Sequence, residues 1–167
     1  TQHAEQAWKK ALAQVTPTIV YPNSKHSSHV SELHCQLDTN LTTKVNEYCQ
    51  AHGITLNTLI QGAWAAQLGS LTSRDNVVFG SPVSGRFSDI NGIDEQVGLF
   101  SNTLPVSVKL NTTETILSQL INLQNQQINL ISHDCLGLGE IQRLVNADNL
   151  FDTLLVVENY PVQESLL

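Results

Sequence analysis

The sequence predicts an α/β fold in which helices pack on a mixed β-sheet. Apolar residues recur with the period of a one-sided helix over 39–51, 55–69 and 114–131. Continuous or alternating apolar patterns instead predict strands over 76–83, 104–110 and 150–158. Helices alternate with single strands, but two strands follow each other around residue 90, so the sheet need not be purely parallel.

The N-terminal part of the chain combines a helical and a strand pattern. Residues 2–14 predict a helix with apolar residues at helical spacing, in which Trp8 is interpreted as a core-packing side chain. Residues 30–37 alternate roughly and predict a strand, with Leu33 and Leu37 among its inward residues.

Capping residues set the bounds of the next two predicted helices. Asp38 is a favourable N-cap for 39–51, and Gly53 can end that helix. Thr55 can cap the helix that follows. Gly62 lies inside this second helix at a cost of up to about 1 kcal/mol of helix propensity, which predicts close packing against the sheet.

Helical spacing also predicts which side chains these helices bury. The stripe on 55–69 includes Leu56, and the stripe on 114–131 includes Ile121. Gln127 falls on the opposite side of the second of these helices and suits solvent.

Shorter features flank the helix over 114–131. Thr112 or Thr113 can cap its start. His133-Asp134-Cys135 follows its end and is interpreted as a turn into a short helix over 138–145, because the members of a catalytic triad meet in space rather than as consecutive residues.

A group of small and polar residues precedes the strand over 104–110. Gly98, Ser101 and Asn102 lie among apolar residues where the strand begins. A side-chain amide beside a closely approaching backbone can orient a polar substrate group in an apolar cleft. The alternative is that Asn102 caps or bends the entrance of the strand.

Four ordered stretches resemble one family. Val97-Gly-Leu-Phe-Ser-Asn-Thr-Leu-Pro-Val106 resembles the Gly-x-Phe-x-Asn-Thr-Leu-Pro motif of condensation domains in non-ribosomal peptide synthetases. The stretches 77–86, 133–143 and 150–161 resemble other segments of these domains in the same order and separation. The resemblance covers nearly the whole chain.

The resemblance implies a particular part of that architecture. Condensation domains are V-shaped, with two halves that resemble chloramphenicol acetyltransferase. Their catalytic motif, His-His-x-x-x-Asp-Gly, ends the first half, and this sequence contains no His-His pair. Residues 1–167 are therefore expected to be the C-terminal subdomain, an excised fragment without a catalytic residue and inert by itself. The absence of any Met agrees with a piece of a longer polypeptide.

The family's activity is amide-bond formation between a donor and an acceptor on carrier proteins. The resemblance implies that this half forms one wall of the substrate channel and receives part of the phosphopantetheine arm. That arm is carried by partner proteins, so no directly bound cofactor is expected. The implied partners are the N-terminal half of the domain, peptidyl carrier proteins and an adenylation domain.

The resemblance also assigns residues to this channel wall. Asn102 and Ser101 are candidates from the strand entrance. Ser81 is a further candidate because its strand end borders the channel in the family, with Ser84 a weaker choice. Three residues are expected to be structural instead: Arg86, Gly98 and Trp8.

Two alternative functions are also compatible with the sequence. One is an epimerisation or heterocyclisation domain, which shares the fold. The other is a non-catalytic domain that only docks carrier proteins. Half a domain also exposes the apolar face meant for its partner, so self-association is a further expectation.

Composition excludes several other classes. The chain has 167 residues, is 41% hydrophobic and carries a net charge of −7, which favours one folded domain and argues against nucleic-acid binding. No apolar run has the length of a membrane span, and no signal peptide opens the chain. Three dispersed Cys predict reduced thiols in a cytoplasmic protein. The cluster of His26, His29, His34 and Cys35 lacks the spacing of a zinc site, so no metal is expected.

Overall fold

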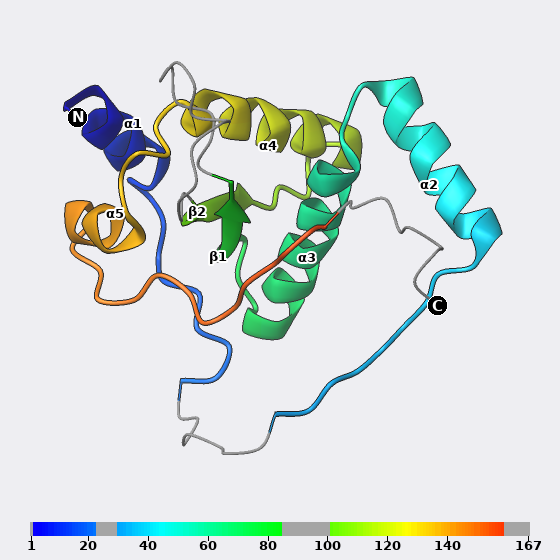
Figure 1. The fold of residues 1–167 in the computed structure, drawn as a ribbon, viewed down its shortest axis with the longest axis horizontal. Helices are drawn as coiled ribbons and strands as arrows, with labels where there is room; N and C mark the ends of the chain where they lie inside the picture. The colour runs from blue at the N-terminus through cyan, green and yellow to red at the C-terminus, as the bar shows by residue number, and fades with distance from the viewer. Residues whose placement is uncertain (1, 23–29, 85–100, 159–167) are drawn as a thin grey trace.

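The computed structural model describes residues 2–22, 30–84 and 101–158. Within these ranges the helices are α1 (Gln2–Ala11), α2 (Thr39–His52), α3 (Leu56–Thr72), α4 (Ile116–Ile131) and α5 (Leu138–Leu144). The strands are β1 (Asn76–Val83) and β2 (Asn102–Lys109). Figure 1 shows α1 and α5 together at one end of the molecule, α2 at the opposite end, and the strands between them. The predicted α/β class is confirmed.

The described sheet has two strands, and β1 lies between β2 and an extended segment near residue 154. β1 pairs with β2 in antiparallel register, with Gly80 opposite Pro105. On its other side, Gly80 N donates to Thr153 O at 3.0 Å, and Leu155 N donates to Gly80 O at 2.9 Å. The segment that contains Thr153 and Leu155 runs parallel to β1 but forms only isolated bridges. The prediction of a regular strand over the whole of 150–158 is therefore wrong. Leu154 is 60% exposed, because no described element covers the segment's outer side.

Both faces of the sheet are covered. Phe79 and Val106 lie opposite each other in the register and pack with Leu68 of α3. Val78 points to the other face and packs with Trp8 of α1. The alternation over 104–110 predicts one buried face for β2, but residues 104–108 are all buried, because helices lie against both faces.

The buried face of α3 differs from the predicted stripe. Leu56 is 37% exposed, whereas Thr58 and Gln61 are buried at 2% and 1%. These polar side chains are tolerated because each hydrogen-bonds to a glutamine of α4. Gly62 also faces α4: a Cβ at this position would collide with the Leu120 side chain, so its close packing is against a helix and not against the sheet.

α4 begins later in the chain than the sequence predicts. The helix begins at Ile116, and its N-cap is Thr115, whose hydroxyl accepts a hydrogen bond from Ser118 N at 3.2 Å. Thr113 instead donates to Asn111 Oδ1 at 2.8 Å, which stabilises a turn before the helix. The predicted burial of Ile121 is also wrong, because this side chain is 39% exposed while Leu123 contacts the sheet-side core.

Other helix ends also differ slightly from their predictions, including those of α2 at His52 and α3 at Thr72. α1 ends at Ala11 and not at residue 14, because its last hydrogen bonds give way to a tighter turn in which Val15 N donates to Leu12 O at 3.1 Å. α5 ends at Leu144, and Val145 is its C-cap.

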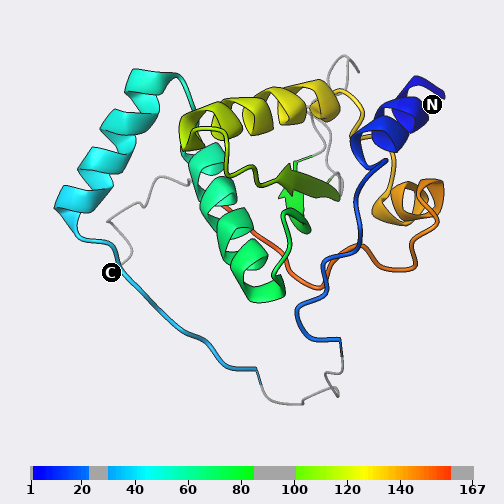
Figure 2. The same cartoon turned by 180° about the vertical axis from the view of Figure 1, so that it is seen from behind.

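The segment before α2 is extended but is not a strand. Val30 and Leu33 are 91% and 97% exposed, so the predicted strand over 30–37 with Leu33 inward is wrong. A strand requires a neighbour for its backbone groups, and no described element pairs with this segment. Figures 1 and 2 show it leaving the body of the molecule before it enters α2.

The predicted caps of α2 and α3 are confirmed. Asp38 accepts a hydrogen bond from Leu41 N at 2.7 Å, and Gly53 ends α2 in the left-handed region with a φ of 65°. Thr55 accepts from Thr58 N at 3.0 Å. Local capping chemistry is sufficient to place these three residues.

Candidate functional site

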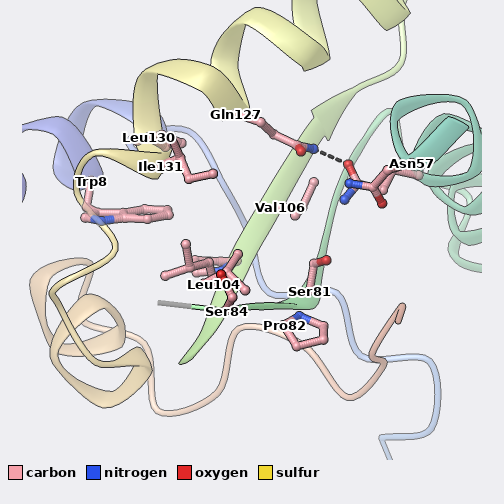
Figure 3. Close-up of a pocket in the computed structure, with 13 residues that line it drawn as sticks. Trp8, Asn57, Ser81, Pro82, Ser84, Leu104, Val106, Gln127, Leu130 and Ile131 are labelled. Carbon is pink, nitrogen blue, oxygen red and sulfur yellow. Dashed lines mark hydrogen bonds between the residues drawn. The ribbon is translucent and has the colours of Figure 1, made fainter. Parts of the chain in front are cut away.

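A cavity of about 300 Å³ lies where the sheet meets α1, α3 and α4. Its apolar walls include Leu104 and Val106 from β2 and Leu130 and Ile131 from α4. Ser81 is opposite Leu104 in the sheet register, which brings the end of β1 to the same place. Figure 3 shows these side chains around one space.

Trp8, a residue of α1, lines one end of this cavity. It is 1% exposed and packs in a core cluster with Leu136 and Ile141. Its indole Nε1 donates to the backbone carbonyl of His133 at 2.9 Å. This bond satisfies a polar atom that burial would otherwise leave unpaired, and it joins α1 to the turn that follows α4.

The opposite end of the cavity carries side-chain amides. Gln127 Nε2 of α4 donates to Gln61 Oε1 of α3. In Figure 3 a dashed line from Gln127 marks this hydrogen bond, and Asn57 is labelled at the same end of the cavity. The prediction that Gln127 faces solvent is wrong, because it is half-buried between two helices. Helical periodicity cannot identify such a residue, since a buried amide with a partner has the same residue type as an exposed one.

The structure brings some of the predicted channel residues together. Ser81, 8% exposed, and Ser84, which is exposed, both line the cavity. Ser101 and Asn102 lie at the start of β2 and are not among its lining residues in the described part of the chain. The two remaining predicted residues, Arg86 and Gly98, lie outside the described residues.

Asn102 is held by backbone contacts. Its Nδ2 donates to the carbonyl oxygens of Asp134 and Leu136, each at 2.8 Å. Its Oδ1 accepts from Thr103 N at 2.9 Å. Both amide protons are therefore used, which favours the alternative in which Asn102 fixes the entrance of the strand. Direct contact with substrate stays a prediction.

Asp134 is the one described carboxyl group with a clear pKa shift. It is 7% exposed, and its Oδ2 is buried without a hydrogen-bond partner among the described residues. Burial raises the pKa of this carboxyl above its usual value of 3.8, and a backbone hydrogen bond partly opposes the rise. Among the described residues, none of those that line the cavity forms a hydrogen bond with the carboxyl group of Asp134.

Metal ligands and membrane-spanning helices are the next features of the described residues. Across residues 2–22, 30–84 and 101–158, no three His, Cys, Asp or Glu side chains converge as metal ligands. His34 pairs with Glu32 at 3.4 Å on the surface, while His26 and His29 lie outside the described residues. None of the described helices is both long and apolar enough to cross a membrane.

The sequence and the fold have counterparts in known proteins. A family model described as "Condensation domain" matches residues 1–167. The chain therefore belongs to the condensation-domain family, as the four sequence stretches predicted. It is 51% identical over 158 residues to vanchrobactin synthetase VabF of Vibrio anguillarum, covering 95% of this chain and 6% of that protein.

Solved structures agree with this assignment at the level of the fold. The first condensation domain of the CDA synthetase matches with a TM-score of 0.74 and 17% identity, covering 96% of this chain and 35% of that chain. A four-domain non-ribosomal peptide synthetase bound to AMP and glycine matches with a TM-score of 0.83 and 17% identity, covering 96% and 13%. The chain is thus a fragment of a condensation domain with the chloramphenicol-acetyltransferase-like fold.

Proposed function

We propose that this chain is the C-terminal subdomain of a condensation domain that forms amide bonds in a non-ribosomal peptide synthetase. One observation carries the proposal. Two of the stretches on which the family resemblance rests, 77–86 and 97–106, contribute Ser81, Ser84 and Leu104 to the same cavity. A third stretch is tied to this site by the hydrogen bond from Trp8 to His133.

The reaction divides the work between the two halves. The amine of the acceptor attacks the thioester carbonyl of the donor, a C–N bond forms, the C–S bond breaks, and the phosphopantetheine thiol leaves with the proton lost by the amine. A histidine of the N-terminal half positions or deprotonates that amine. This chain supplies no catalytic residue and contributes a wall of the channel through Ser81, Ser84, Ser101 and Asn102.

Asn102 acts on this wall through the turn that it holds. Its two bonds to Asp134 and Leu136 connect the strand entrance to the segment that also receives the Trp8 indole. A turn that has lost these bonds misplaces the channel wall, so Asn102→Ala in the complete domain is expected to slow amide-bond formation roughly 10- to 100-fold. An unchanged rate would remove Asn102 from the functional assignment.

Exposed leucines on residues 30–41 support the proposal that another part of the domain covers this segment. Leu33 is 97% exposed, Leu37 58% and Leu41 45%, although such side chains are normally covered. The N-terminal half of the same domain is the proposed cover. In its absence the fragment self-associates through this face, and light scattering that detects only monomer at high concentration would argue against this.

The function is tested by measuring peptide-bond formation from loaded carrier proteins. The complete condensation domain should yield the amide product by mass spectrometry, while residues 1–167 alone should yield none. Product formed by the isolated chain would overturn its assignment as the non-catalytic half. An upstream sequence without an intact His-His-x-x-x-Asp-Gly motif would overturn the enzyme assignment itself and leave carrier-protein docking.

A further inference from the structure

The cavity described above has mostly apolar walls, with Ser81 and Ser84 at the end of β1 and a group of amides at one end. Gln61 is 1% exposed, and it is held against Gln127 by a hydrogen bond between α3 and α4. Burying polar amides costs free energy unless their groups are paired. This pairing uses only one acceptor of Gln61 and one donor of Gln127.

The pair leaves complementary groups available. Gln61 Nε2 donates to no described residue, and Gln127 Oε1 accepts from none. A side-chain amide offers two N–H donors and a carbonyl acceptor. Together the two glutamines therefore present one kind of donor and one kind of acceptor to the cavity that they line.

The rest of the cavity disfavours a charged ligand group. None of the described residues that line it is acidic, basic or a histidine. A charged ligand group would lose its hydration here without a counter-charge, which is strongly unfavourable. A neutral group with one donor and one acceptor fits both the polar end and the apolar walls around Leu104 and Val106.

We propose that Gln61 and Gln127 bind a secondary amide group of the carrier-bound substrate. The inference rests on the proposed function and names the chemistry that this wall recognises. A secondary amide has one N–H and one C=O, which match the free acceptor of Gln127 and the free donor of Gln61. Such amides occur both in a phosphopantetheine arm and in a peptide donor.

The test compares ligands that differ only at the amide. The arm probe is S-ethyl-N-acetylcysteamine, an unreactive thioether, and its partner has a methylene in place of N–H. The peptide probe is N-acetylalanine ethyl ester, with the same replacement in its partner. Dissociation constants for the complete condensation domain are measured by NMR titration. Loss of one hydrogen bond predicts about ten-fold weaker binding of the methylene analogue for whichever source occupies the site.

The double variant Gln61→Met/Gln127→Met removes both amides at similar side-chain length. Replacing both partners with apolar groups is nearly neutral for stability, and the thermal midpoint verifies folding. The variant should bind amide and methylene probes equally. Gln67→Met is the matched control, because Gln67 is an exposed glutamine of the same helix outside the cavity and its variant should keep the ten-fold preference.

Three results would overturn the inference: no binding of either amide probe to the wild-type domain, no preference for the amide in that domain, or an unchanged preference in the double variant. The wild-type comparison alone decides the matter if the double variant does not fold. Amide-bond formation is measured in the same preparations. If the domain forms the amide product but shows no preference for the amide probes, only this inference fails. If the domain forms no amide product, the proposed function fails.

Discussion

Asn102 and Asp134 are joined by a 2.8 Å hydrogen bond from a side-chain amide to a backbone carbonyl. The same nitrogen donates to Leu136 O at 2.8 Å. Through these bonds the start of β2 holds a turn that lies 32 residues further along the chain. The turn also carries the carbonyl that accepts the Trp8 indole, so one amide organises a junction of β2, α1 and the segment after α4.

Replacing Asn102 should destabilise the complete domain. Asn102→Ala leaves two carbonyl oxygens without their donor, and we expect a loss of about 1–3 kcal/mol in the free energy of unfolding. Asn102→Asp should be at least as damaging, because a carboxylate cannot donate and would face the same two carbonyls. Urea unfolding measures both effects. Wild-type midpoints for both variants would contradict this structural role.

Gly62→Ala should destabilise the domain although alanine favours helices. The added Cβ would collide with Cδ2 of Leu120, a buried side chain that would have to leave its present conformation. Overpacking of this kind outweighs the propensity gain, and a net loss of about 1–2 kcal/mol is expected from thermal unfolding. Gly139→Ala in α5 is the control: a Cβ there meets nothing within 4 Å, so this variant should be neutral or slightly more stable.

Thr18 links the segment after α1 to the central strand. Its side chain is 0% exposed, and its Oγ1 accepts from Val78 N at 2.9 Å. Thr18→Val keeps the volume but leaves the N–H buried and unpaired, at an expected cost of about 1–3 kcal/mol. Thr18→Ser keeps the hydroxyl and loses only a methyl group, about 1 kcal/mol. A valine variant as stable as the wild type in urea would show that this bond contributes nothing.

Asp134 should make stability depend on pH. Its raised pKa means that the folded state binds a proton more readily than the unfolded state, so its contribution to stability falls as the pH rises from 3.8 through the folded pKa. Asp134→Asn removes the buried charge and should raise the melting temperature most at neutral pH. The difference from wild type should shrink as the pH is lowered to about 4. A difference that is constant with pH would contradict the shift.

Local chemistry was sufficient for several features of the fold. The caps at Asp38, Gly53 and Thr55 and the bounds of β1 agree with the sequence prediction, because each depends on residues adjacent in the chain. The buried face of α3 was not predictable in the same way. Gln61 is buried because it finds a hydrogen-bond partner on α4. Helical periodicity alone treats Gln61 as a polar and therefore exposed residue.

The candidate site was predicted only in part. The family resemblance identified Ser81 and Ser84, which line the cavity, because their stretch has a recognisable order of residues. It did not identify Gln61 and Gln127, which are 66 residues apart and belong to different helices. It also did not indicate that the amide of Asn102 is used by the carbonyls of a distant turn.

The sequence by itself determined the class of fold, the family, and the approximate positions of the described helices and of β1 and β2. These properties depend on short-range spacing and on motifs that a single chain displays. Only the tertiary structure decided which polar side chains meet, which face of each helix is buried, and that the extended segment before α2 has no partner among the described residues. Those outcomes depend on contacts between distant segments, and the free energy of a buried amide is set by the partner that it finds across the fold.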